Sequence, residues 1–205
     1  MRYSLSIIIL FLCFGGIAGI FWHQEYRYSL PTPVPANYKA VLVGQPVSSQ
    51  EFDAVLPQGP LFLHFYNPDC PCSRFNARYL KSLIRTYEDS VQLFIVVPSE
   101  KAKHKALREF GKDHQYFIDE NGKLAATYGV YATPQAVLID RKGNLFYRGN
   151  YNKSRYCTTR ATNYAELALI ALLNNQPPPQ FEFYATQSYG CELPTNENER
   201  QFNFY

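Results

Sequence analysis

Two cysteines separated by a single proline, Cys70 and Cys72, are the residues of this sequence best suited to covalent chemistry. They follow an apolar run, Leu61 to Tyr66, that predicts a buried β-strand, and a turn at Asn67-Pro68-Asp69. Helical spacing of apolar residues begins shortly after Ser73. A cysteine between a strand end and a helix start lies beside unpaired N–H groups and the positive end of the helix dipole. Both favour the thiolate, so the sequence predicts a nucleophilic sulfur at Cys70 that performs thiol–disulfide exchange.

The other cysteines leave several pairings open. The chain has five cysteines, of which Cys13 lies in the apolar N-terminus, and the remaining four allow three full pairings. Cys72 is expected to resolve a mixed disulfide on Cys70, with a bystander role as the alternative. Cys157 and Cys191 are expected to form a structural disulfide that ties the C-terminal tail to the last helix. The alternative is that Cys191 resolves Cys70, and the sequence does not decide between the two.

Three landmarks of the chain, in this order, resemble those of the thioredoxin-like superfamily. The strand with Phe65-Tyr66 and the pair Cys70-Pro71 resemble its active-site entry. Ala132-Thr133-Pro134, followed by an apolar strand, resembles its cis-proline loop, and residues 140–149 resemble its closing hairpin. The resemblance covers roughly residues 40 to 175. Within the superfamily the chain is similar to bacterial extracytoplasmic redoxins, which also carry a late Gly-Cys pair, here Gly190-Cys191.

This resemblance implies an α/β fold in which helices flank a central mixed sheet. It also implies a cis peptide before Pro134, which joins Cys70 and Cys72 in the catalytic site, and a substrate-binding role for Thr133. A proline loop of this kind leaves backbone groups near Cys70 able to pair with an extended client strand. The implied partners are a client protein with a thiol or disulfide and a second redox protein that recycles the site. No cofactor and no metal are expected.

The active-site motif departs from those of two known thiol enzymes. Thioredoxins use Cys-x-x-Cys, whereas here the fourth position is Ser73 and the second cysteine comes one residue early. Typical peroxiredoxins have a threonine three residues before the reactive cysteine, and here that residue is Asn67. A Cys-Pro-Cys pair does serve as a redox disulfide in the import oxidoreductase of the mitochondrial intermembrane space. The spacing is therefore chemically usable.

Two further classes of function remain as alternatives to an oxidoreductase. Two close thiolates favour a soft ion such as Cu(I), which is typical of a thioredoxin-like copper-binding accessory protein. A redoxin that has lost turnover would be an interaction module, with Cys70 as a buried structural thiol. His64, inside the first strand, is expected to be a satisfied buried histidine rather than a base. The net charge of +3, with basic and acidic residues interspersed, gives no indication of a nucleic-acid surface.

The N-terminus predicts a membrane segment. Nineteen residues from Ser4 to Trp22 are nearly all apolar, which is long enough to cross a bilayer. A cleaved signal peptide is the alternative, but bulky residues at Gly19-Ile20-Phe21-Trp22 disfavour cleavage. We therefore expect a single-pass anchor in the inner (cytoplasmic) membrane, with the domain on the periplasmic side. The expected divisions are residues 1–26 for the anchor, 27–39 for a proline-rich spacer, 40–176 for the thioredoxin-like domain and 177–205 for an irregular tail.

The rest of the chain predicts alternating strands and helices. Periodicity and turn residues predict further strands at 38–43, 91–97, 116–119, 136–139 and 145–148. They predict helices at 100–110 and 121–128, and a short helix that starts at 48–51. A last helix is expected to be capped by Thr158 or Thr159. This order is consistent with a single α/β domain.

Overall fold

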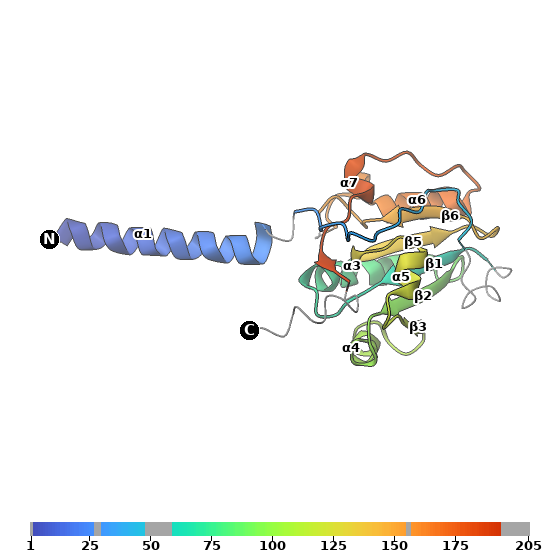
Figure 1. Ribbon diagram of the computed structural model, residues 1–205, viewed down its shortest axis with the longest axis horizontal. Helices are drawn as coiled ribbons and strands as arrows, with labels where there is room; N and C mark the ends of the chain where they lie inside the picture. The colour runs from blue at the N-terminus through green and yellow to red at the C-terminus, as the bar shows by residue number, and fades with distance from the viewer. Residues whose placement is uncertain (1, 27–29, 48–58, 155–156, 194–205) are drawn as a thin grey trace.

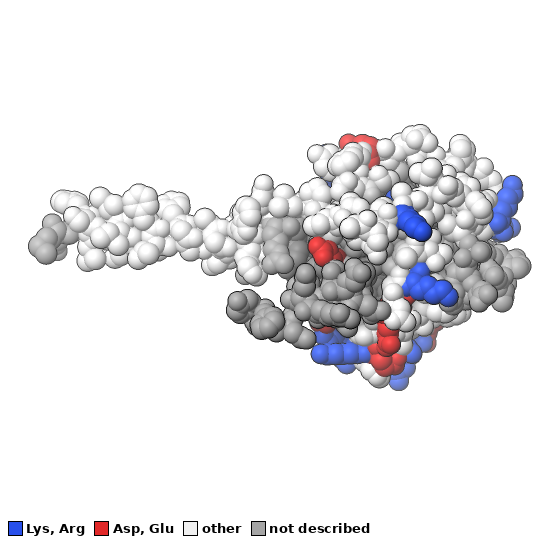
Figure 2. Space-filling view, viewed as in Figure 1, with Lys and Arg blue, Asp and Glu red and all other residues white. Residues whose placement is uncertain are grey.

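A computed structural model describes residues 2–26, 30–47, 59–154 and 157–193. Figure 1 shows a long N-terminal helix that projects from an α/β domain. This helix, α1 (Arg2–Phe21), continues into a π-helical turn, η1 (Trp22–Tyr26). Its segment Tyr3–Phe21 is long and apolar enough to cross a membrane, and none of it is buried inside the protein. The visible face of this segment carries no Lys, Arg, Asp or Glu (Figure 2).

The domain is built on a mixed sheet with the strand order β3-β2-β1-β5-β6. Its strands are β1 (Leu61–Phe65), β2 (Gln92–Val97), β3 (Gln115–Ile118), β5 (Gln135–Ile139) and β6 (Leu145–Gly149). Strand β1 runs parallel to β2 and antiparallel to β5, so it lies at the centre of the sheet. The strand that leads to the candidate site is therefore hydrogen-bonded along both edges.

Helices cover both faces of this sheet. They are α3 (Pro71–Tyr87), α4 (Glu100–Phe110), α5 (Lys123–Thr127), α6 (Tyr164–Leu173) and α7 (Phe183–Thr186), with a 3-10 turn at η3 (Arg160–Thr162). One core contains residues of α3, α4 and α6, and the other contains residues of α5. Side chains alternate along β1, with Phe62 in the first core and Leu63 and Phe65 in the second. This two-sided burial explains the continuous apolar sequence of β1.

The predicted fold class is confirmed: helices flank a central mixed sheet, and an apolar helix precedes the domain. One predicted strand is wrong. Residues 38–43 form no strand, and the segment instead packs through side chains, with the Tyr38 hydroxyl donating to the Gly129 carbonyl at 3.0 Å. The last helix starts at Tyr164, after η3, rather than at Thr158 or Thr159. The short helix expected at 48–51 lies outside the described residues.

The proline-rich segment and the C-terminal tail contact each other in the structure. Thr32, in the proline-rich segment, is buried, and its N–H donates to the Ser188 carbonyl at 2.9 Å. Pro31 forms an antiparallel bridge with Tyr189. The described part of the tail carries α7 and a short strand, β7 (Cys191–Glu192). The spacer was expected to be extended and the tail to be largely irregular, and in the structure the two segments pair with each other.

Candidate active site

Cys70 lies at the N-terminus of α3, directly after β1. It is the N-cap residue of α3, and Pro71 occupies the first helical position, where its missing N–H has no bond to lose. The turn before it is closed by the Cys70 N–H, which donates to the Asn67 carbonyl at 3.0 Å. Pro68 follows Asn67 and ends the strand. The expected strand–cysteine–helix arrangement is therefore present, with the Cys70 side chain buried.

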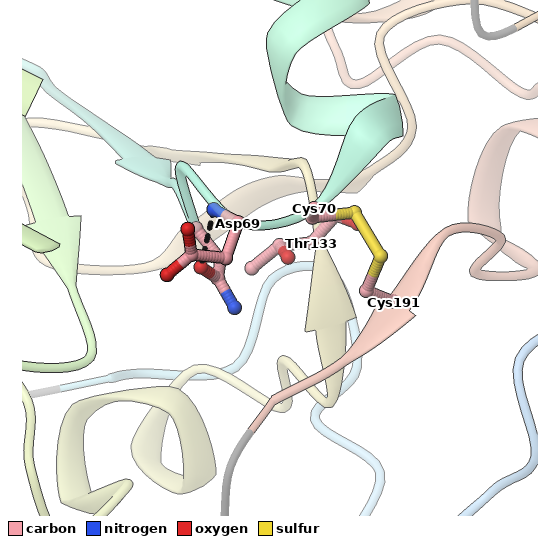
Figure 3. Close-up of a disulfide and its surroundings, with 5 residues drawn as sticks. Asp69, Cys70, Thr133 and Cys191 are labelled. Atoms are coloured by element: carbon pink, nitrogen blue, oxygen red, sulfur yellow. Dashed lines mark hydrogen bonds between the residues drawn. A yellow bond between two sulfur atoms is a disulfide. The ribbon is translucent and has the colours of Figure 1, made fainter. Parts of the chain in front are cut away.

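The disulfide at this position joins Cys70 to Cys191, as Figure 3 shows. The two Cα atoms are 5.9 Å apart, within the usual range for such a bond, although 121 residues separate the two cysteines. The expected bridge between Cys157 and Cys191 is therefore wrong in this structure. The alternative pairing is the one formed, because the pairing of the C-terminal segment with Ala132 and Thr133 places Cys191 opposite Thr133, next to Cys70.

The proline loop lies against both Cys70 and Cys191. The Thr133–Pro134 peptide is cis, as the resemblance implied. The Thr133 carbonyl oxygen is 3.5 Å from the Cys70 sulfur. Thr133 ends the short strand β4 (Ala132–Thr133), and β4 pairs antiparallel with β7, so that Thr133 faces Cys191. Residues Thr133 and Pro134 are thus brought together with Cys70, and Figure 3 shows β7 alongside this loop.

Polar contacts hold the C-terminal segment just before Cys191. The Ser188 hydroxyl and the Gln135 side-chain amide are 2.5 Å apart, and both residues are fully buried. The Tyr189 hydroxyl donates to the Asn152 carbonyl at 2.5 Å. Neither Gln135 nor Ser188 was predicted as a site residue, since a polar residue in a strand and one in a tail have no distinguishing spacing. The Gly190-Cys191 pair was the only sequence signal for this segment.

The structure places the other two cysteines of the domain on one side of α3. Cys72 is in the first turn of α3, is fully buried and lies outside the disulfide. The Cys157 thiol donates to the Asn76 side-chain oxygen at 3.0 Å. Burial raises the pKa of Cys157 to about 12, so its thiolate is disfavoured near neutral pH. The structure therefore does not bring Cys72 or Cys157 into the bond with Cys70.

His64 is buried, as expected from its place in β1, but only one of its two ring nitrogens has a hydrogen-bond partner among the described residues. Its Nδ1 atom is 2.7 Å from the Tyr151 hydroxyl, and its ring lies edge-on to that of Phe110. Burial lowers the pKa of His64 to about 3. Its ring is therefore neutral at physiological pH and stabilises the core rather than acting on Cys70.

Charges near the candidate site are few. Asp69, directly before Cys70, forms an ion pair with Lys105 of α4. Within the described part of the chain, no three His, Cys, Asp or Glu side chains converge as a metal site.

The fold is that of thioredoxin-like proteins. A solved hypothetical protein from Sinorhizobium meliloti 1021 has a TM-score of 0.64 with 17% identity, over 78% of this chain and 97% of that one. A candidate thiol:disulfide interchange protein DsbE from Chlorobium tepidum has a TM-score of 0.52 with 18% identity, over 65% of this chain and 99% of its own. Both share the fold with this protein.

The sequence itself identifies the family. A family described as a domain of unknown function (DUF6436) matches residues 42–193, and the chain belongs to this family. The match reaches Leu193, so it includes the segment that carries Cys191. The chain is also similar to the thiol:disulfide interchange protein DsbE of Haemophilus influenzae, with 27% identity over 144 residues, 63% of this chain and 79% of that protein.

Acid should destabilise the protein partly through His64. Its pKa is lowered in the folded state, so between about pH 6.5 and about pH 3 only the unfolded chain takes up this proton. His64 therefore contributes stability that is complete above about pH 6.5 and is lost as the pH falls, by up to about 1.4 kcal/mol per pH unit. We expect His64→Gln to flatten the pH dependence of the unfolding free energy, measured by urea denaturation, over this range.

The matched control is His104→Gln, because His104 is exposed on α4. This variant should keep the slope of the unmodified protein. Equal slopes in the unmodified protein and in His64→Gln would contradict the account of a buried neutral histidine.

Proposed function

We propose that this protein is a membrane-anchored thiol–disulfide oxidoreductase that acts on protein disulfides outside the cytoplasm, with Cys70 as nucleophile and Cys191 as resolving cysteine. The observation that carries the proposal is the Cys70–Cys191 disulfide at the N-terminus of α3, beside the cis-Pro134 loop. A helix N-terminus stabilises a thiolate, and the proline loop offers backbone groups to an extended strand. These are the requirements of a thiol exchange site.

The reaction proceeds through two exchanges. In the reduced protein, the Cys70 thiolate attacks one sulfur of a client disulfide, forms a mixed disulfide and releases the other client sulfur as a thiolate. The Cys191 thiolate then attacks the Cys70 sulfur and releases the second client thiolate. Two electrons pass from the protein to the client, and the Cys70–Cys191 disulfide is formed. A partner dithiol must reduce this bond before the next cycle, and the same steps in reverse oxidise a client.

Thr133 and Pro134 have a binding role in this reaction, whereas Cys72 has none in the exchange itself. Thr133 and Pro134 bind the client through the backbone of the proline loop, because the Thr133 carbonyl lies against the Cys70 sulfur. The proposed role of Cys72 changes from resolving cysteine to a buried neighbour of the site, since Cys191 occupies the bonding position. The site uses the thiol of Cys191 from the tail in place of the second cysteine of a Cys-x-x-Cys motif.

Replacing Cys70 should abolish turnover. We expect Cys70→Ser to reduce the rate of disulfide reduction at least about a hundredfold, because Cys72, the other thiol in the first turn of α3, is fully buried. Cys191→Ser should instead accumulate a mixed disulfide between Cys70 and the client, since its resolving thiol is missing. Insulin reduction measures the first effect, and non-reducing electrophoresis with mass mapping measures the second.

Cys157→Ser serves as the control for these variants, because Cys157 is a half-buried thiol that hydrogen-bonds to Asn76 and should be dispensable for turnover. It should retain activity within about twofold of the unmodified protein. Undiminished turnover in Cys70→Ser would overturn the proposal.

The apolar N-terminal helix predicts that the protein is held in a membrane. The segment Tyr3–Phe21 is long enough to span a bilayer, and the domain begins within a few tens of residues after it. We expect the full chain to stay in the membrane fraction after alkaline extraction, and externally added protease to digest the domain in spheroplasts. A variant that lacks residues 1–26 should be released. Protection of the domain in intact spheroplasts, with digestion only after lysis, would contradict the extracytoplasmic location.

A further inference from the structure

The groove beside the proline loop is occupied by the protein's own C-terminal segment, residues Gly190 to Leu193. This segment lies antiparallel to β4, with Glu192 opposite Ala132 and Cys191 opposite Thr133. The Leu193 N–H donates to the Tyr131 carbonyl at 3.1 Å. The segment thus makes the backbone contacts that an extended client strand would make, and its cysteine is bonded to the nucleophile.

We propose that residues 190–193 are an internal copy of the client, and that the groove selects extended client segments of matching chemistry. Such a segment carries glycine immediately before the reactive cysteine and an aliphatic residue two positions after it. This inference rests on the proposed function, and it adds to it the sequence class of the client.

The glycine requirement follows from the close approach of the two chains. Gly190 has a φ of +128°, and a Cβ atom on it would overlap the carbonyl oxygen of Thr133. The same Cβ would also lie 3.5 Å from the Cδ atom of Pro134. The atom in the way is backbone, so the loop itself would have to move to admit a side chain at this position.

The aliphatic requirement follows from the contacts of Leu193. This side chain packs against the core on the α5 side of the sheet, where it lines a small pocket with Phe65, Pro98 and Ala125. The intervening Glu192 is exposed. A client should therefore insert an aliphatic side chain two positions after its cysteine, and a polar residue should be accepted between them.

The contacts of residues 191–193 allow this segment to leave the groove once the disulfide is reduced. The buried Ser188 and the hydrogen-bonded Tyr189 anchor the chain up to Gly190. Beyond Gly190, residues 191–193 are held by the disulfide, by the pairing with β4 and by Leu193. Reduction of the disulfide removes the covalent link, so a client can replace these residues, and their return brings Cys191 back to resolve the mixed disulfide.

The test uses the reduced full chain with Cys191→Ser and the peptide Ser-Tyr-Gly-Cys-Glu-Leu, whose cysteine carries a thionitrobenzoate group. Attack of the Cys70 thiolate on the peptide sulfur forms the Cys70–peptide disulfide and releases thionitrobenzoate, which absorbs visible light. The rate measured with the Cys70→Ser/Cys191→Ser chain is subtracted, and mass mapping confirms the bond at Cys70. Peptides with alanine for glycine, aspartate for leucine, or glutamine for glutamate are compared with the parent peptide.

We expect the alanine and aspartate peptides each to react about tenfold more slowly than the parent. The glutamine peptide, changed at the solvent-facing position, should match the parent. Equal rates for all four peptides would overturn the inference while leaving the proposed function standing. If Cys70 reacts with none of the peptides and also fails to react with oxidised glutathione, the proposed function itself fails.

A second variant tests occupation of the groove by the segment. In the Cys191→Ser chain, Leu193→Ala should raise the rate with the parent peptide roughly fivefold, because the segment loses its apolar contact and competes less. Leu167→Ala, at a partly exposed leucine on α6, is the matched control and should leave the rate unchanged. An unchanged rate in Leu193→Ala would show that the segment does not compete with the client.

Discussion

The antiparallel pairing of β4 with β7 is the interaction on which the site depends. It places Cys191 opposite Thr133, and Thr133 lies against the sulfur of Cys70. The two cysteines are 121 residues apart in the sequence, and this pairing is what brings them within bonding distance. The pairing is in turn supported by the proline-rich segment, since Thr32 binds the backbone of Ser188 on the way to β7. The two ends of the domain therefore meet at its active site.

This arrangement separates the two thiols that most redoxins place on one helix. The nucleophile Cys70 belongs to the rigid sheet–helix junction, where β1 is paired on both edges and α3 begins. The proposed resolving thiol of Cys191 belongs to residues 191–193, which are held by the disulfide, by the pairing with β4 and by the Leu193 side chain. In the mechanism that we propose, reduction of the disulfide releases these residues, so that a client binds between the two exchanges.

The sequence predicted the rigid part of the protein well and the pairing of its ends poorly. The apolar strands, α4 and the cysteine before α3 were found because periodicity and turn residues are local signals. The cis-Pro134 loop was identified through resemblance. The partner of Cys70 was not identified, since a two-residue strand such as Cys191–Glu192 is too short to show a hydrophobic pattern. Its register on β4 is fixed only in the folded chain. The expected Cys157–Cys191 bridge failed for the same reason.

The central claim, that Cys70 and Cys191 form the redox-active pair, is tested most directly by thiol trapping of the full chain across a graded glutathione redox series, with peptide mapping of each cysteine. The account predicts one reversible disulfide, Cys70–Cys191, while Cys72 and Cys157 stay reduced at every potential. A Cys70–Cys72 bond, or a fixed Cys157–Cys191 bond with Cys70 reduced throughout, would contradict it.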